Sequence, residues 1–176
     1  IRDRCERAGG SLFEDACARK RPQHAVEAVF PNASGLREVG RRPRTIAEQV
    51  NAIGRMGAVI HNAGIYLTRG RDATPDGHTS IRAVNTLAPY MLTALIERPD
   101  RLIYLSSAEH YAGTGPLHDL DFVTRRWDAA RAYRESKLHV VALAFALARR
   151  WPDVLSNAVD PGWARSRMGG SSAPVS

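Results

Sequence analysis

Apolar side chains recur at helical spacing in three stretches of the chain. Residues 45–55 ("TIAEQVNAIGR") form one short amphipathic pattern, and residues 74–98 form a longer one. Residues 128–151 carry the strongest helical pattern of the sequence. Pro89 lies inside the second stretch, where it should kink or interrupt the helix because proline has no N–H to donate.

Short apolar runs that end in polar or glycine residues lie between and after these helical stretches. They cover residues 57–64, 101–107 and 154–162. Short, continuous apolar runs are typical of strands buried on both faces of a parallel sheet. The alternation of strand and helix therefore predicts βαβ units, and the expected fold class is α/β with a doubly wound parallel sheet.

Each predicted strand ends in residues suited to binding a ligand. These are Asn62-Ala63-Gly64, Ser106-Ser107 and Asp160-Pro161-Gly162. Open parallel sheets bind ligands beyond the carboxyl ends of their strands. We therefore expect these three groups to share one cleft.

The net charge of +7 raises the question of a nucleic-acid partner. Only Lys20 and Lys137 are lysines, and the arginines are spread along the chain apart from residues 40–44 ("GRRPR"). This distribution favours a solvated, arginine-rich surface, so we expect no nucleic-acid partner.

Cysteine content and hydropathy restrict the class of protein further. Cys5 and Cys17 are the only cysteines, and no His/Cys cluster has metal-ligand spacing, so we expect neither a disulfide scaffold nor a metal site. No run of apolar residues is long enough for a membrane span, and residues 1–20 are too charged for a secretory signal. These features predict a cytoplasmic protein without a membrane span.

Tyr133 and Lys137 stand four positions apart in the strongest helical stretch and so share one helix face. A phenol is a poor base at neutral pH, because its reference pKa is about 10. A neighbouring ammonium group stabilises the phenolate and lowers that pKa. The pair alone is weak evidence, because this spacing occurs by chance on many helices.

Four further motifs accompany this pair, in a fixed order. The five are "HNAGI" (61–65), "AVNTLAPYMLT" (83–93), "RLIYLSSAEH" (101–110), "AYRESKLHV" (132–140) and "DPGW" (160–163). Together they resemble the short-chain dehydrogenase/reductase family from about residue 44 to 168, and Ser-Ser-x-x-His is similar to its retinol-dehydrogenase-like branch. The resemblance implies a Rossmann-like doubly wound parallel sheet, with an atypical segment at 1–43, a core at 44–168 and a flexible tail at 169–176.

The resemblance also implies roles for individual residues. Tyr133 would be the general acid/base, Lys137 would lower its pKa and bind the nicotinamide ribose, and Ser107 would hydrogen-bond the substrate oxygen. Asn85 would hold a water molecule in the proton relay. The other implied cofactor contacts are Asn62, Ala63, Gly64, Pro161, Gly162 and Ser166.

Several neighbouring residues have plainer explanations than a role in the site. Asn62 could equally tie adjacent strands together, and Ser106 is more readily explained as a strand-end neighbour than as a catalyst. His110, Tyr111 and Trp163 lie where substrate contacts are expected, although loop packing explains them better. We do not expect His61 to be a ligand.

The implied function is hydride transfer between NAD or NADP and a small-molecule alcohol or carbonyl substrate. The sequence leaves open the substrate, the choice between the two cofactors, and assembly into a homo-oligomer. One alternative is a catalytically impaired, truncated paralogue that acts as a non-catalytic binding protein. A basic nucleic-acid binder is a third hypothesis, which rests on charge alone.

The ends of the chain depart from the family pattern. No glycine-rich turn between a strand and a helix precedes the matching region, and little follows "DPGW", so the sheet is expected to be incomplete at both ends. Either the sequence is a fragment or its gene was misread, or the product lacks these elements and binds dinucleotides poorly. Residues 1–43 should be the least ordered part, with a surface helix after Ser11, at best one strand at 24–30 ("HAVEAVF") and no phosphate site.

Overall fold

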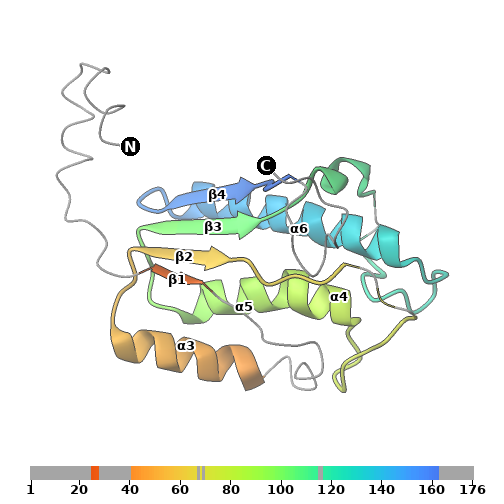
Figure 1. Ribbon diagram of the computed structural model, residues 1–176, viewed down its shortest axis with the longest axis horizontal. Coiled ribbons are helices and arrows are strands. Elements are labelled where there is room, and N and C mark those ends of the chain that lie inside the picture. Colours follow the sequence, from red (N-terminus) through yellow and green to blue (C-terminus); the bar gives the residue numbers. More distant parts are fainter. Residues whose placement is uncertain (1–24, 28–40, 67, 69, 115–116, 163–176) are drawn as a thin grey trace, which may run out of the picture.

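A computed structural model describes residues 25–27, 41–66, 68, 70–114 and 117–162 (Figure 1). Its elements in chain order are β1 (Ala25–Glu27), α3 (Arg41–Ile53), β2 (Ala58–His61), α4 (Ser80–Arg82), η2 (Ala83–Leu87), α5 (Ala88–Leu95), β3 (Arg101–Leu105), η3 (Ala108–Ala112), α6 (Ala129–Arg150) and β4 (Leu155–Val159). The helices and strands predicted after residue 44 are all present within a few residues of their expected bounds. Among the described residues, no helix is long and apolar enough to span a bilayer.

Four parallel strands form one sheet in the order β1-β2-β3-β4. The expected α/β fold with a parallel sheet is thus confirmed, and Ala25–Glu27 confirms a strand within residues 24–30. Because every strand runs in the same direction, the ends of β2, β3 and β4 lie at one edge of the sheet (Figure 1).

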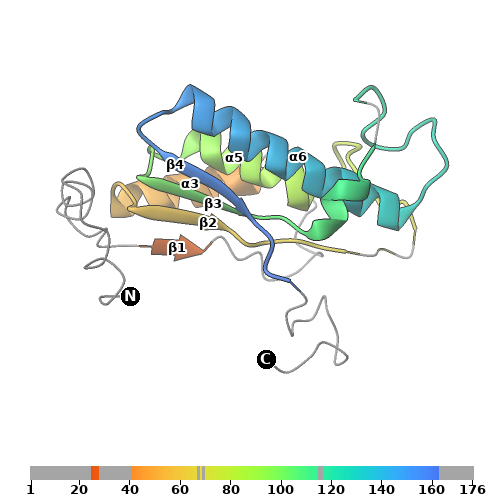
Figure 2. The same ribbon diagram turned by 90° about the horizontal axis from the view of Figure 1, so that it is seen from above.

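The core lies between this sheet and a layer made of α3, α5 and α6. Alternate strand residues such as Val59, Leu102 and Tyr104 point into this layer, where they pack with Leu92 of α5 and Val140 of α6. Figure 2 shows the three helices on the same side of the sheet. The described residues therefore contribute one of the two helical layers of a doubly wound sheet.

Pro89 interrupts the helix between β2 and β3, as the sequence predicts. The preceding residues Ala83–Leu87 form a π-helical turn, in which the N–H of Ala88 donates to the carbonyl of Ala83, five residues earlier. In an α-helix the carbonyl of Asn85 would accept from residue 89, and a proline there cannot donate. The π turn accommodates the proline and directs the Asn85 side chain into the interior, where it is 1% exposed.

The connection from η3 to α6 is a loop folded around Asp119. This carboxylate accepts hydrogen bonds from the backbone N–H groups of Val123, Thr124 and Arg125 at 2.7–3.1 Å. Burial alone would raise the pKa of Asp119, but the donors, Arg125 foremost, outweigh it and hold the pKa well below its usual range. Arg125 then forms a bidentate ion pair with Glu135 of α6 at 2.9 and 3.0 Å, so the loop is fastened to the helix that carries Tyr133.

A buried polar cluster around His61 lies between the sheet and α5. The Thr93 hydroxyl is 3.1 Å from His61 Nε2 and 2.6 Å from the Tyr104 hydroxyl, and the rings of His61 and Tyr104 stack with centroids 4.7 Å apart. His61 is only 4% exposed, and burial lowers its pKa from 6.5 to about 4. His61 is therefore a core residue at neutral pH and not part of the ligand edge.

We expect this histidine to make the fold acid-sensitive. Its folded pKa lies below its unfolded value, so the unfolded chain binds the extra proton and stability falls as pH drops from about 6.5 towards 4. Between about pH 7 and pH 5 the loss due to His61 should be about 2 kcal/mol. The variant His61→Phe keeps a ring against Tyr104. Its free energy of unfolding, measured with urea at several pH values, should therefore fall less between pH 7 and pH 5 than that of the wild type. An equal dependence of stability on pH in His61→Phe and in the wild type would contradict this assignment.

Candidate active site

The sequence-predicted cofactor contacts lie at the carboxyl edge of the sheet. Asn62 is exposed directly after β2, and Ala63 and Gly64 are half-buried behind it. Pro161 and Gly162 are exposed after β4. Ser166 and Trp163 fall outside the described residues.

Tyr133 projects from the second turn of α6 towards the end of β3. Its side chain is mostly buried, and the Ser107 side chain lies near its hydroxyl and lowers its pKa. The ring of Tyr66 meets the Tyr133 ring edge to face, with centroids 4.6 Å apart. Burial raises the Tyr133 pKa, as do the charges of Tyr66, Glu109 and Asp160, and together these effects outweigh that of Ser107.

Lys137 lies one turn further along α6 and is almost completely buried. Its Nζ donates to the carbonyl of Leu105 at the end of β3, at 2.7 Å, and lies 5.6 Å from the Tyr133 ring centroid. Burial lowers the Lys137 pKa to about 8.

That Lys137 lowers the Tyr133 pKa stays a prediction. Burial and neighbouring charges raise that pKa overall, and the Lys137 ammonium is bonded to a backbone carbonyl. Lys137 contributes a buried positive charge beside the sheet edge.

The side-chain amide of Asn85 makes its hydrogen bonds within the protein. Its Oδ1 accepts from the N–H of Ile65 at 2.9 Å, while its Nδ2 donates to the Ile65 carbonyl at 2.9 Å and to Ser136 Oγ at 3.0 Å. Both amide hydrogens are therefore used by the protein itself. The side chain holds the segment after β2 against α6.

Two serines that sequence reasoning left outside the site hold the turn that carries Tyr133 and Lys137. Ser136 Oγ donates to the Tyr133 carbonyl at 2.7 Å, and Ser106 Oγ donates to the Lys137 carbonyl at 3.3 Å. Both serines are more than 90% buried. A buried serine in a helix or at a strand end has no distinguishing sequence pattern, so only the fold could identify this pair.

Asp160 ties the ends of β3 and β4 together. Its Oδ2 accepts from the N–H of Ala108 at 3.0 Å, and its Oδ1 accepts from the N–H of Gly162 at 3.0 Å. Gly162 has φ +68°, a conformation that favours glycine, and a Cβ there would meet no described residue within 4 Å.

The short helix η3 is held against α6 beside Tyr133. Glu109 forms an ion pair with Arg134 at 2.6 Å, and a Cβ on Gly113 would lie 2.8 Å from the Arg134 carbonyl oxygen. His110 Nδ1 donates to the Ser107 carbonyl at 2.6 Å, which supports loop packing for this residue, whereas the neighbouring Tyr111 is 84% exposed. In the part of the chain that the structure describes, no group of three or more His, Cys, Asp or Glu side chains could hold a metal ion.

Searches with known sequences return oxidoreductases. The chain is 40% identical over 135 residues to an uncharacterized oxidoreductase of Emericella nidulans, covering 74% of this chain and 50% of that protein. It is 38% identical to the short-chain dehydrogenase chyC of Penicillium rubens (84% and 60% covered) and 30% identical to human retinol dehydrogenase 13 (95% and 50% covered). No family profile matches the chain.

Solved structures of the same fold agree with these relatives. A protein of Mycobacterium paratuberculosis superposes with a TM-score of 0.67 at 28% identity, covering 76% of this chain and 50% of the other. A blue fluorescent protein in complex with NADPH, from a metagenomic library, gives 0.55 at 22% identity (78% and 52% covered). A short-chain dehydrogenase/reductase of Serratia marcescens gives 0.52 at 20% identity (82% and 70% covered), and these last two show the fold alone.

The chain spans 50–60% of the length of these three sequence relatives. Within that span, the sheet order, the ends of β2, β3 and β4 and the helix with Tyr133 and Lys137 all agree with the family motifs. This chain therefore belongs to the short-chain dehydrogenase/reductase family.

Proposed function

We propose that the protein is an NAD(P)-dependent oxidoreductase that moves a hydride between the nicotinamide and an alcohol or carbonyl substrate. The observation that supports it most is that the Ser107 side chain lies near the Tyr133 hydroxyl, beside the buried ammonium of Lys137. A substrate oxygen placed between these two hydroxyls would be held and protonated at the same point.

The residues at the sheet edge fit the nicotinamide end of such a cofactor. Lys137 supplies a positive charge near its ribose, and Gly162 has no side chain to hinder a flat ring. Asn62, Ala63, Gly64, Tyr133, Lys137, Pro161 and Gly162 would contact it. When bound, NAD(P) donates or accepts the hydride. The expectation that no phosphate site is formed concerns residues 1–43, of which the structure describes only 25–27 and 41–43, and it stays a prediction.

Tyr133 would act as the general acid in carbonyl reduction. The surrounding groups raise its pKa, so at neutral pH it is a phenol that carries the proton the carbonyl oxygen needs. In alcohol oxidation the same oxygen must first lose its proton, which the environment disfavours. We therefore propose that carbonyl reduction is the direction favoured near neutral pH.

Asn85 would contribute through its backbone as well as its side chain. Both of its amide hydrogens are committed to Ile65 and Ser136. Its main-chain carbonyl cannot accept from residue 89, because Pro89 has no N–H. We propose that this carbonyl, rather than the side-chain amide, accepts from the water of the proton relay.

The proposal is tested by assaying the purified protein with NADH and NADPH against a panel of aldehydes and ketones, following the absorbance of the reduced nicotinamide. Turnover with at least one pair supports it. Absence of turnover with every pair, in protein that circular dichroism shows to be folded, would favour the alternative of a non-catalytic binding protein.

Lys137→Met should separate activity from stability. We expect the rate to fall at least about 100-fold, because the buried charge is lost. The folded Lys137 pKa of about 8 lies below its unfolded value of 10.5, so burying the ammonium costs stability below about pH 8, and this cost disappears as pH rises towards 10.5. The free energy of unfolding of Lys137→Met at neutral pH should therefore equal or exceed that of the wild type. A large loss of stability would mean that the Leu105 hydrogen bond dominates instead.

A further inference from the structure

Ser136 forms hydrogen bonds both to the turn of α6 that carries Tyr133 and to Asn85. Its hydroxyl donates to the Tyr133 carbonyl at 2.7 Å and accepts from Asn85 Nδ2 at 3.0 Å. The side chain is buried, as is that of Asn85, so both bonds are shielded from water.

On its other side, Asn85 makes two hydrogen bonds to the backbone of Ile65, both at 2.9 Å. Ile65 immediately precedes Tyr66, whose ring contacts the ring of Tyr133. The segment after β2 is thus joined to Tyr133 twice, once through the ring contact and once through Asn85 and Ser136. A shift of either segment would be transmitted to the Tyr133 hydroxyl.

A serine in the middle of a helix lowers the stability of that helix, and the hydrogen bonds of Ser136 give a reason for having one at this position. Serine is a poorer helix former than alanine, and a hydroxyl bonded back to a carbonyl of the preceding turn slightly destabilises the helix. If Ser136 served the helix alone, alanine would do as well or better.

We propose that Ser136 is a positioning residue that fixes the Tyr133 hydroxyl opposite Ser107 by linking the Tyr133 carbonyl, through Asn85, to the segment after β2. This inference rests on the proposed function of Tyr133 as the acid/base. Ser136 itself does not touch the reacting atoms.

The test is the variant Ser136→Ala, compared with Ser156→Ala. Ser156 of β4 donates its hydroxyl to the Ala144 carbonyl of α6 at 2.9 Å, far along this helix from Tyr133. The Ser156 variant therefore also loses a hydrogen bond to an α6 carbonyl, but outside the site. We expect kcat/KM to fall about 10- to 100-fold in Ser136→Ala and to stay within about twofold of wild type in Ser156→Ala. Both variants should remain folded, and Ser136→Ala should lose more stability because it leaves the buried Asn85 Nδ2 without one acceptor.

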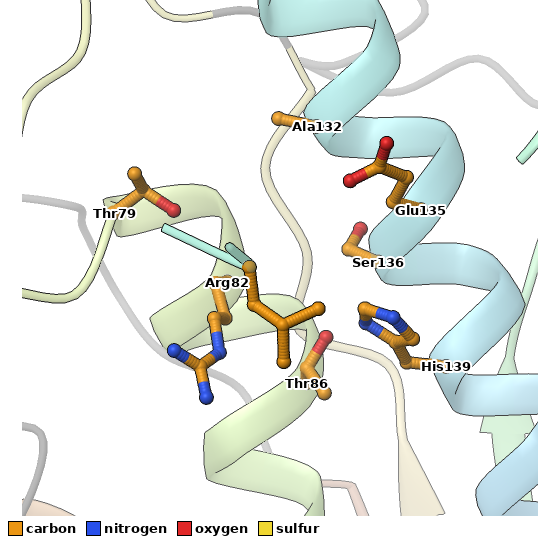
Figure 3. A pocket seen from close by; sticks show the side chains of 8 residues that line it. Thr79, Arg82, Thr86, Ala132, Glu135, Ser136 and His139 are labelled. Atoms are coloured by element: carbon orange, nitrogen blue, oxygen red, sulfur yellow. The ribbon is translucent and has the colours of Figure 1, made fainter. Parts of the chain in front are cut away.

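A rescue variant distinguishes the hydroxyl from side-chain volume. In a helix, a threonine hydroxyl can bond to the carbonyl three residues earlier, which here is Tyr133. Ser136 lies beside Thr86 and His139 in the lining of a small pocket (Figure 3). Ser136→Thr should therefore recover most of the activity, and failure to recover it in folded protein would count against the proposal.

A second readout does not depend on turnover. The Tyr133 phenol is followed by NMR in protein labelled at the tyrosine ring carbon and assigned with Tyr133→Phe. Moving the Tyr133 hydroxyl away from Ser107, whose side chain lowers the Tyr133 pKa, should shift the titration to higher pH in Ser136→Ala but not in Ser156→Ala. If the wild type turns over no substrate, the proposed function fails and this titration alone decides the role of Ser136. Identical titration in all three proteins would overturn the proposal.

Discussion

Replacing Tyr133 by phenylalanine is expected to reduce carbonyl reduction about 1,000-fold, within the range that general acid–base groups contribute. The variant removes only the hydroxyl that meets Ser107, and it keeps the ring that packs against Tyr66. We therefore expect the free energy of unfolding to change little. Initial rates with the best substrate of the panel, together with urea unfolding, measure both effects.

Tyr90→Phe is the matched control for this experiment. Tyr90 lies on α5 with 58% of its surface exposed, so losing its hydroxyl should alter neither rate nor stability. If Tyr133→Phe retained the wild-type rate while Tyr90→Phe behaved as expected, proton transfer by Tyr133 would be excluded. A fall in both variants would point to a general effect of the substitutions on the preparation.

The largest loss of stability is expected from Arg125→Met. Glu135 is 3% exposed and Arg125 is 17% exposed, and their bidentate contact compensates for burying the carboxylate. Removing one partner of a buried ion pair costs about 3–5 kcal/mol, because the remaining charge stays desolvated. Urea unfolding at neutral pH should show a loss of this size.

Two further variants test whether the uncompensated charge is the cause. In the double variant Arg125→Met with Glu135→Leu the charge is gone, and most of the stability should return. Asp153→Asn breaks the exposed ion pair with Arg98, whose side chains are 62% and 49% exposed, and should change stability by less than about 1 kcal/mol. A double variant no more stable than Arg125→Met would show that Arg125 acts mainly through Asp119 and Phe122, over whose ring it lies.

Local periodicity was sufficient to predict the regular elements after residue 44. The helical pattern of 128–151 became α6 (Ala129–Arg150), because apolar residues recur along one face and Asp128 caps its start by accepting from the Arg131 N–H at 3.0 Å. The π turn before Pro89 could not be foreseen in that detail. The proline predicts an interruption, but whether the chain kinks, breaks or gains a wider turn depends on what the helix packs against.

The candidate site was predictable to the extent that its residues follow strands. Ser107 and Tyr133 were expected together because one ends a strand and the other lies on the next helix. The direction of a long side chain is decided by tertiary packing, so the hydrogen bond from Lys137 to the Leu105 carbonyl could not be predicted from sequence spacing. The parts played by Ser106 and Ser136 depend on carbonyls brought near by the fold, which a linear pattern does not record.

The π turn at Ala83–Leu87 makes the length of this helix a functional property. A π ring closes over one residue more than an α ring, so deleting one residue here would return the turn to α-helical spacing and leave the proline below a carbonyl to which it cannot donate. The residue at position 85 would rotate by about 100° away from Ile65 and Ser136. The extra residue of this turn therefore serves two ends at once, because it accommodates the proline and keeps the Asn85 amide between the segment after β2 and α6.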